Sequence, residues 1–347
     1  MFALENLNAR LQGIAPRRVY NLLMGRLEHK MGLSRLHNLP AKLSVESGNV
    51  CNLRCPLCPT GQHDPSAKKG LLPLQTFKKV IDELGGGLLL LRLYDWGEPL
   101  LNPELVPMIE YASARAIPVK ISTNLSLKLD EAQRRALLSS GLRKMYVSCN
   151  AASPETYPTY HVGGDFHLVM ENLRFLAEEK RKLASPTELV WLFHVFSHNE
   201  HETEKVKAMA GGLGVRLEIK KMRPDMGKEI FETAGEAIRR DGHWLPKNPE
   251  YNIFNTGKRG RGTLQRAPTS CDLLWTETVI NWDGAVLPCC SVYSERYSFG
   301  NILERSFKEI WNGEMYVAAR KEVLSKEENG TTWTICRMCK KTGFLHG

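Results

Sequence analysis

The chain between residues 42 and 222 alternates short apolar runs with longer stretches of helical periodicity. The apolar runs predict strands, at 42–47, 88–94, 118–122, 143–149, 188–196 and 215–220. Stretches with apolar residues three and four positions apart predict helices, at 74–84, 103–116, 130–140, 166–184 and 200–211. Such regular alternation is typical of parallel βαβ units, and six strands are too few to close an eight-stranded barrel. We therefore expect an α/β fold, an open TIM-like partial (β/α)6 barrel over residues 41–222.

Three residues indicate where individual helices begin and end. We expect Asp130 to cap the helix at 130–140, because an Asp side chain accepts hydrogen bonds from the free amides of a first turn. We expect Gly141 and Gly212 to end two helices in the left-handed conformation, which glycine adopts without strain.

The segments on either side of this barrel have other patterns. Leucines three and four positions apart predict a helical prefix at 1–40 that packs on the main domain, with a membrane-surface role as the alternative. Residues 223–270 contain four prolines and a basic Gly-containing stretch, and we expect a connector there. Residues 271–347 form a smaller unit, with a β-hairpin over 276–287 that turns at an Asp-Gly pair, followed by a helix at 305–325.

The whole chain has 347 residues, a formal charge of +9 and the composition of an ordinary globular protein. No apolar segment resembles a signal peptide or a membrane span, so we expect a cytoplasmic protein without a transmembrane segment. The excess basic residues gather in 1–40 and 258–266. We interpret them as solvated surface, with a phosphate-bearing substrate or an acidic lipid surface as alternatives. No RNA-binding module accompanies them, and we expect no nucleic-acid partner.

Nine cysteines are the unusual feature, and most of them lie in short clusters. An odd number in a long chain favours metal ligation in a reducing compartment over a disulfide framework. Cys51, Cys55 and Cys58 form a C-x3-C-x2-C motif directly after the first predicted strand. Three thiolates are one fewer than a cubane iron–sulfur cluster needs, which leaves one iron open for another ligand. A structural zinc site would prefer four ligands.

This motif, after the first strand of a βα partial barrel, resembles the radical S-adenosylmethionine superfamily. The resemblance implies that the three cysteines bind a [4Fe–4S] cluster whose open iron chelates the amino and carboxylate groups of S-adenosylmethionine. One electron from the cluster then cleaves this cofactor to a 5′-deoxyadenosyl radical, while the protein positions the cofactor and excludes water. We expect an external one-electron reductant of the flavodoxin or ferredoxin type as a partner.

Other segments extend the resemblance. Trp96-Gly97-Glu98-Pro99 matches the family's GGE-like segment, with Trp96 in place of its first glycine, and implies that Gly97 and Glu98 hold the methionine ammonium. Ser122 and Asn124 match the positions that hold ribose hydroxyls or the carboxylate. The resemblance implies a larger set of cofactor-binding residues, with His194 as a weaker candidate beside Asn199: Leu57, Gly97, Glu98, Ser122, Asn124, Ser148, Asn150 and His194.

One segment departs from the family's pattern. Ser148-Cys149-Asn150-Ala151 stands where relatives commonly have S-x-D-G. Asn150 keeps hydrogen-bonding capacity but lacks the carboxylate's charge, so the substrate here differs if that Asp does chemistry in relatives. Strand alternation turns Cys149 away from its neighbours, and we expect a buried thiol.

Four further cysteines, Cys271, Cys289, Cys336 and Cys339, are enough to fill a four-ligand site. Their spacing resembles the twitch domain, the short form of the SPASM domain, which implies one auxiliary [4Fe–4S] cluster. Zinc is the main competing metal for four thiolates. Cys290 is left over, and could replace Cys289 as the ligand or remain a free thiol near the cluster.

A fully ligated auxiliary cluster suits electron transfer, and this favours oxidation of a sugar-like or natural-product substrate. Asp95 is then the expected base for the released proton, with Tyr94 and Glu277 as alternatives. If Cys290 instead donates a hydrogen atom to the substrate radical, the outcome is epimerisation. A peptide-modifying SPASM maturase is the alternative function, and a non-catalytic iron–sulfur electron carrier is a remote one. The substrate is thus a small molecule or a peptide, with or without a phosphate group.

Overall fold

The computed structural model describes residues 15–62, 68–223, 234–254, 271–325 and 332–342. One eight-stranded sheet has the strand order β6-β5-β4-β3-β2-β1-β7-β8. Its strands are β1 (Lys42–Val45), β2 (Leu90–Arg92), β3 (Val119–Thr123), β4 (Lys144–Ser148), β5 (Glu188–Val195), β6 (Arg216–Lys221), β7 (Glu277–Ile280) and β8 (Val286–Leu287). All neighbours pair in parallel except β7 and β8, so β6 and β8 are the two open edges. The open partial barrel of six parallel strands is confirmed.

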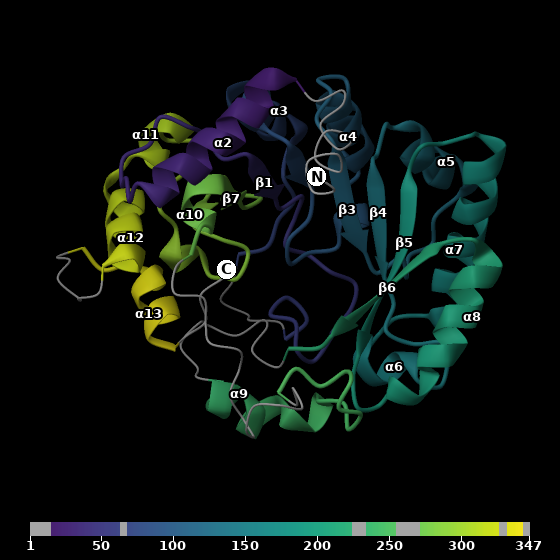
Figure 1. The fold of residues 1–347 in the computed structure, drawn as a ribbon. Coiled ribbons are helices and arrows are strands. Elements are labelled where there is room, and N and C mark those ends of the chain that lie inside the picture. The colour runs from purple at the N-terminus through teal and green to yellow at the C-terminus, as the bar shows by residue number, and fades with distance from the viewer. Residues whose placement is uncertain (1–14, 63–67, 224–233, 255–270, 326–331, 343–347) are drawn as a thin grey trace, which may run out of the picture.

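Helices surround the sheet on its outer side, as Figure 1 shows for α5, α7 and α8. The barrel helices are α3 (Leu74–Leu84), α4 (Leu105–Ser113), α5 (Glu131–Ser139), α6 (Tyr157–Tyr160), α7 (Phe166–Lys182) and α8 (Thr203–Leu213). Their apolar faces pack on alternate residues of the strands, such as Leu43, Leu91 and Met145, which are fully buried in one continuous core. The remaining helices are α2 (Pro16–Lys30), α9 (Ala234–Asp241), α10 (Leu273–Thr276), α11 (Phe307–Trp311), α12 (Glu314–Leu324) and α13 (Ile335–Thr342).

The expected caps are confirmed at two of three positions. Asp130 and Gln133 form a reciprocal capping box at the start of α5, and Gly141 has φ +82°. The expectation for Gly212 was wrong, because α8 continues through it and ends at Gly214, which has φ +66°. Continuing the helix brings Leu213 against the core, which compensates for two glycines in its last turn.

The expected helix at 305–325 is interrupted at residues 312–313. Ser306 caps α11, and Gly313 precedes α12. A Cβ atom at Gly313 would lie 3.0 Å from the carbonyl oxygen of Glu309, so glycine allows the second helix to begin close to the end of the first. In the expected connector, the described residues include α9, which the sequence pattern did not predict; the basic stretch 258–266 lies outside the described residues.

The expected hairpin forms between β7 and β8, but β7 has a second role. It pairs in parallel with β1, with Lys42 opposite Glu277 and Val45 opposite Ile280. The C-terminal unit therefore continues the barrel sheet as its seventh parallel strand. This pairing joins residues that are 235 positions apart in the chain.

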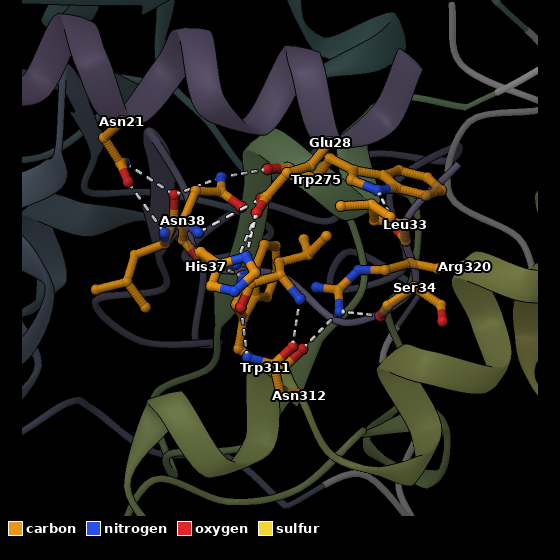
Figure 2. Close-up of polar contacts among 12 residues, drawn as sticks. Asn21, Glu28, Leu33, Ser34, His37, Asn38, Trp275, Trp311, Asn312 and Arg320 are labelled. Atoms are coloured by element: carbon orange, nitrogen blue, oxygen red, sulfur yellow. Dashed lines mark hydrogen bonds and ion pairs between the residues drawn. The ribbon is translucent and has the colours of Figure 1, made fainter. Parts of the chain in front are cut away.

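The segment after α2 connects the N-terminal helix to the C-terminal unit (Figure 2). The side chain of Asn38 donates to the carbonyl of Trp275 at 2.8 Å, and the Trp311 indole donates to the carbonyl of Asn38 at 3.0 Å. The buried guanidinium of Arg320 donates to three carbonyls, those of Leu274, Ser34 and Trp311. We name this set of contacts the Asn38–Arg320 clasp. Within the described chain, no helix is both long enough and apolar enough to cross a membrane.

Candidate functional site

A cavity of about 270 Å³ lies at the carboxyl ends of the barrel strands. The loop after β1 supplies Cys51, Cys55 and Cys58 to its wall. The ends of β2 to β5 supply the other predicted residues, namely Asp95, Gly97, Glu98, Ser122, Asn124, Ser148, Asn150 and His194, and Leu57 completes the set. The structure thus brings together every cofactor-binding residue that the sequence predicts. Ligand sites at this edge of a parallel sheet are the rule for such folds.

The three-cysteine loop is held by contacts that leave its thiols facing the cavity. The amide of Cys58 donates to the carbonyl of Cys55 at 3.1 Å, and the amide of Leu53 donates to the Cys51 thiol at 3.4 Å. A Cβ atom at Gly61 would lie 2.5 Å from the Cys55 carbonyl, so only glycine allows the loop to close. Burial raises the pKa of Cys51 to about 12, and it raises the pKa of Cys55 and Cys58 as well. A bound cation would reverse this preference and hold them as thiolates.

Gly97 and Glu98 fix the end of β2 against its neighbours. A Cβ atom at Gly97 would lie 1.8 Å from the carbonyl oxygen of Gly48, which no other residue type could tolerate. The Glu98 carboxylate accepts from the amides of Leu100 at 3.0 Å and Asn124 at 2.7 Å. Burial raises the pKa of Glu98 to about 7. Glu98 therefore ties the end of β2 to the end of β3 within the cavity wall.

Asn124 links the end of β3 to the cysteine loop. Its side-chain amide donates to the Asn52 side chain at 2.9 Å and lies 3.8 Å from the Cys51 thiol. Its side-chain oxygen accepts from the amide of Ser126 at 2.8 Å. Part of the hydrogen-bonding capacity of Asn124 is therefore used to position the loop.

Asn150 connects β4 to β5 and to a histidine that the sequence analysis missed. The side-chain oxygen of Asn150 accepts from the backbone amide of His194 at 2.8 Å. The backbone amide of Asn150 donates to Nε2 of His161 at 3.0 Å. Nδ1 of His161 lies 3.8 Å from the Cys55 thiol. Burial lowers the pKa of His161 to about 3 and of His194 to about 4, so both rings are neutral. An isolated His with no motif around it offers no signal in one sequence.

Asn199 is completely buried and holds the ends of β4 and β5 together. Its side-chain amide donates to the carbonyls of Asn150 at 2.8 Å and His194 at 3.0 Å, and its oxygen accepts from the amide of Phe196 at 2.7 Å. Asn199 thus positions two predicted cofactor residues without lining the cavity itself. Cys149 is buried in the core on the other side of β4, as expected.

The four C-terminal cysteines line one apolar pocket. Cys336 and Cys339 come from consecutive turns of α13, Cys271 precedes α10, and Cys289 follows β8. Among the described residues, no three His, Cys, Asp or Glu side chains lie close enough to hold a single metal ion. Four cysteines around one pocket are the number of thiolates that a fully ligated [4Fe–4S] cluster needs.

Cys290 faces a different, narrower cavity and is exposed to it. Arg92, Glu277 and Ser44 line this second cavity, which Cys289 also borders. The structure thus places Cys289 with the other three cysteines and Cys290 between the two cysteine sites. Burial, together with the nearby Asp95, raises the pKa of Cys290 to about 11.

A pair of buried carboxyl groups lies between the cavity and the C-terminal unit. Glu46 follows β1, and Asp95 follows β2. One Asp95 oxygen is buried without a hydrogen-bond partner in the described part of the chain. Burial raises the pKa of Glu46 to about 7 and the pKa of Asp95 well above its ordinary range, and the charge of Glu46 raises the pKa of Asp95 further.

Two family models match the chain. A model of the radical SAM superfamily matches residues 45–210, and a model of the SPASM iron–sulfur cluster-binding domain matches residues 271–340. The first covers the barrel with the three-cysteine loop, and the second covers all four cysteines of the C-terminal pocket. The fold and the two cysteine sites thus coincide with the parts that the models describe.

Individual relatives match over most of the chain. The mycofactocin maturase MftC of Mycobacterium ulcerans is 25% identical over 285 residues, which cover 78% of this chain and 74% of the maturase. A second relative, from Pyrococcus furiosus, is the tungsten-containing aldehyde ferredoxin oxidoreductase cofactor-modifying protein. It is 26% identical over 316 residues, which cover 79% of this chain and 81% of the relative.

Among solved structures, Streptococcus suis SuiB bound to S-adenosylmethionine has the same fold. Its TM-score is 0.63 at 12% identity, with 98% of this chain and 83% of SuiB covered. A second SuiB structure holds the precursor peptide SuiA. Its TM-score is 0.61 at 12% identity, with 91% of this chain and 74% of SuiB covered.

Proposed function

We propose that this chain, which belongs to the radical S-adenosylmethionine superfamily and carries a C-terminal SPASM domain, modifies a peptide substrate. The chain is a radical SAM enzyme, and its cofactors are S-adenosylmethionine and two [4Fe–4S] clusters. Residues 41–222 would form the catalytic barrel, and residues 271–347 the auxiliary-cluster domain.

The observation that carries the proposal is the match to a maturase over 78% of this chain. This match supports the peptide-modifying alternative over oxidation or epimerisation of a sugar-like molecule. SuiB, whose fold this chain shares, has been solved with a precursor peptide. The fold itself is therefore compatible with a peptide substrate.

The residues of the cavity suit the two groups that they would hold. Cys51, Cys55 and Cys58 would ligate the first cluster, and Cys271, Cys289, Cys336 and Cys339 the auxiliary one. Gly97 and Glu98 would hold the methionine ammonium, Ser122 and Asn124 the carboxylate or ribose, and Leu57 the adenine. Ser148, Asn150 and His194 would complete the cofactor pocket. When bound, these groups supply a 5′-deoxyadenosyl radical that removes a hydrogen atom from the substrate.

Asp95 in its ionised form, which the nearby charge of Arg92 favours, is the side chain best placed to take a proton from the substrate. It lines the cavity, and one of its oxygens has no hydrogen-bond partner among the described residues. Loss of a hydrogen atom to the radical, then of one electron to the auxiliary cluster and one proton to Asp95, would oxidise the substrate by two electrons. Cys290 faces the narrower cavity instead, so hydrogen-atom donation from its thiol is the less favoured route.

The experiment compares peptides with sugars and aminocyclitols by their effect on release of 5′-deoxyadenosine. Anaerobically reconstituted enzyme, with S-adenosylmethionine and a flavodoxin or ferredoxin reductant, is incubated with peptides encoded beside its gene or with a panel of sugars and aminocyclitols. We expect peptides to increase 5′-deoxyadenosine release and to lose two hydrogen atoms by mass spectrometry. Cys58→Ala is the control without cluster chemistry. Stimulation by the sugar panel alone would refute a peptide substrate.

A further inference from the structure

The inner face of the barrel sheet carries a row of positive charges beneath the cavity. Along β2, β3 and β4, the residues facing the helices are apolar and buried, such as Leu91, Val119 and Met145. The residue adjacent to each of these, after it on β2 and β3 and before it on β4, faces the other side, because side chains alternate along a strand. These three residues are Arg92, Lys120 and Lys144.

The strand register aligns the three cations. Arg92 pairs with Lys120 across β2 and β3, and Lys120 pairs with Lys144 across β3 and β4. Neighbouring strands are about 4.8 Å apart, so like charges at paired positions repel one another and destabilise the sheet. A row of this kind needs either counterions from the protein or a ligand.

The protein supplies counterions to the two outer members of the row. Arg92 lies 2.8 Å from the Glu277 carboxylate, and Lys144 lies 2.7 Å from that of Glu188. The side chain of Lys120 has no ion pair or hydrogen bond within the described part of the chain. Burial lowers the pKa of Lys120, and the charges of Lys144 and Arg92 lower it further; the carboxylates of Glu188 and Glu218 raise it but do not offset the lowering.

The imbalance extends over the whole inner face. Glu277 also pairs with Lys42, while Glu188 and Glu218 share Arg216 and Glu218 also pairs with Lys220. In β1 to β7, the inward rows therefore hold six cations against three carboxylates, and the cations are Lys42, Arg92, Lys120, Lys144, Arg216 and Lys220. Glu46 and Asp95 lie above this row, and their raised pKa values limit the negative charge that they add.

Lys120 lies one layer of side chains below the cofactor cavity. Ser122, two positions further along β3, lines the cavity, as does Tyr94, two positions beyond Arg92 on β2. Two residues along a strand span about 6.6 Å. A substrate held beneath the cofactor can therefore place a group beside Lys120 while its reacting carbon stays in the cavity.

We propose that Lys120, flanked by Arg92 and Lys144, binds an anionic group of the substrate, either a carboxylate or a phosphate. This proposal rests on the proposed function, because it assigns the row to the substrate of the same cavity. It explains why a cation without a direct counterion is kept inside the barrel, where burial and the neighbouring cations disfavour its charge. Binding of an anion would offset the repulsion along the row.

The test measures binding of three probes to the anaerobic holoenzyme by calorimetry, with S-adenosylmethionine present. The probes are acetyl-trialanine with a free C-terminal carboxylate, the same peptide as its C-terminal amide, and inorganic phosphate. We expect wild type to bind an anionic probe at least about tenfold more tightly than the amide. Tighter binding of the acid peptide than of phosphate assigns a carboxylate, and the reverse assigns a phosphate.

Two variants locate the binding. Lys120→Met should weaken binding of the anion about tenfold or more, and Lys120→Arg should retain most of it. Lys128→Met removes an exposed lysine beyond the same strand and should change nothing. Lys120→Met should also raise the melting temperature slightly, which verifies that the variant is folded.

Three results would overturn the proposal: equal affinity for acid and amide peptides, equal affinity of wild type and Lys120→Met, or no binding of either anion at millimolar concentration. Release of 5′-deoxyadenosine is measured in the same samples. If wild type releases none, the proposed function fails, whatever the probes show. If release is normal but the anions do not bind, only the assignment of Lys120 fails.

Discussion

The Glu98 carboxylate accepts a hydrogen bond of 2.7 Å from the backbone amide of Asn124, and so joins two strand ends that face the same cofactor. The other carboxylate oxygen accepts from Leu100 at 3.0 Å. Both bonds depend on two acceptor oxygens in one planar group. A glutamine has only one, so the exchange would leave one buried amide without its acceptor.

Glu98→Gln should therefore weaken binding of S-adenosylmethionine by about tenfold or more, which corresponds to about 1.4 kcal/mol. The measurement is equilibrium binding of the cofactor to anaerobic holoenzyme. Glu110→Gln, an exposed change on α4, is the matched control. An unchanged affinity in Glu98→Gln would show that the carboxylate holds neither the strand end nor the cofactor.

Iron content should distinguish the cysteines that ligate a cluster from those that do not. Wild type should hold about eight irons per chain after anaerobic reconstitution, as expected for two cubane clusters. Cys58→Ala and Cys336→Ala should each lower the count to about four, because each removes one ligand of one cluster. Cys290→Ala should keep about eight, since Cys290 does not line the four-cysteine pocket. A loss of iron in Cys290→Ala with none in Cys289→Ala would reverse the assignment of the ligand.

Asp95→Asn should separate cofactor cleavage from product formation. The variant keeps the side chain's size but cannot accept the substrate proton, so 5′-deoxyadenosine should form while the product falls at least about a hundredfold. Cys290→Ala is examined beside it, and we expect product formation to continue. The opposite pattern, with product lost only in Cys290→Ala, would favour hydrogen-atom donation by the thiol.

Arg320→Met should destabilise the holoenzyme, because each buried carbonyl left without its donor costs about 1–3 kcal/mol. The guanidinium is fully buried, donates to three carbonyls and stacks on the rings of Trp311 and Tyr316. Methionine fills the space but leaves those carbonyls without donors. Anaerobic urea unfolding measures the effect, with Arg174→Met, an exposed change on α7, as control. Similar unfolding midpoints for the two variants would contradict the role of the Asn38–Arg320 clasp.

Glu46→Gln should stabilise the protein increasingly as the pH rises. The pKa of Glu46 is raised from 4.5 to about 7 by burial, so the folded state binds the proton more tightly than the unfolded state. The cost of ionisation is absent below pH about 4.5 and complete above about 7, on the order of 3 kcal/mol. Unfolding at pH about 5 and about 8 measures the difference between wild type and variant. A difference that does not grow with pH would mean that Glu46 ionises freely.

Most of the fold and the cofactor site could be predicted from the sequence because their signals are local. The spacing of Cys51, Cys55 and Cys58 lies within one loop, and parallel strands bring their carboxyl ends to one edge wherever the βαβ pattern is recognised. The pairing of β7 with β1 was not predictable in this way, since no local pattern specifies a partner 235 positions away.

The remaining omissions have the same physical origin. His161 acts through contacts with Cys55 and Asn150, and its own neighbours in the sequence carry no motif. Lys120 is an ordinary lysine on a short strand until the register sets it between two other cations. Such features depend on tertiary pairing, which only the folded chain reveals.

The position of β7 beside β1 also fixes an order of events during synthesis. Chains emerge from the ribosome N-terminus first, at about 5–20 residues per second, so β1 waits for its second neighbour until nearly the whole chain has been made. Until then β1 presents an unpaired edge, the kind of surface on which strands from other chains assemble. The three-cysteine loop directly after β1 emerges during the same interval, before the C-terminal unit can close beside it. A translational stop between β6 and residue 277 would therefore yield a product with its cysteine loop complete and its sheet open to aggregation.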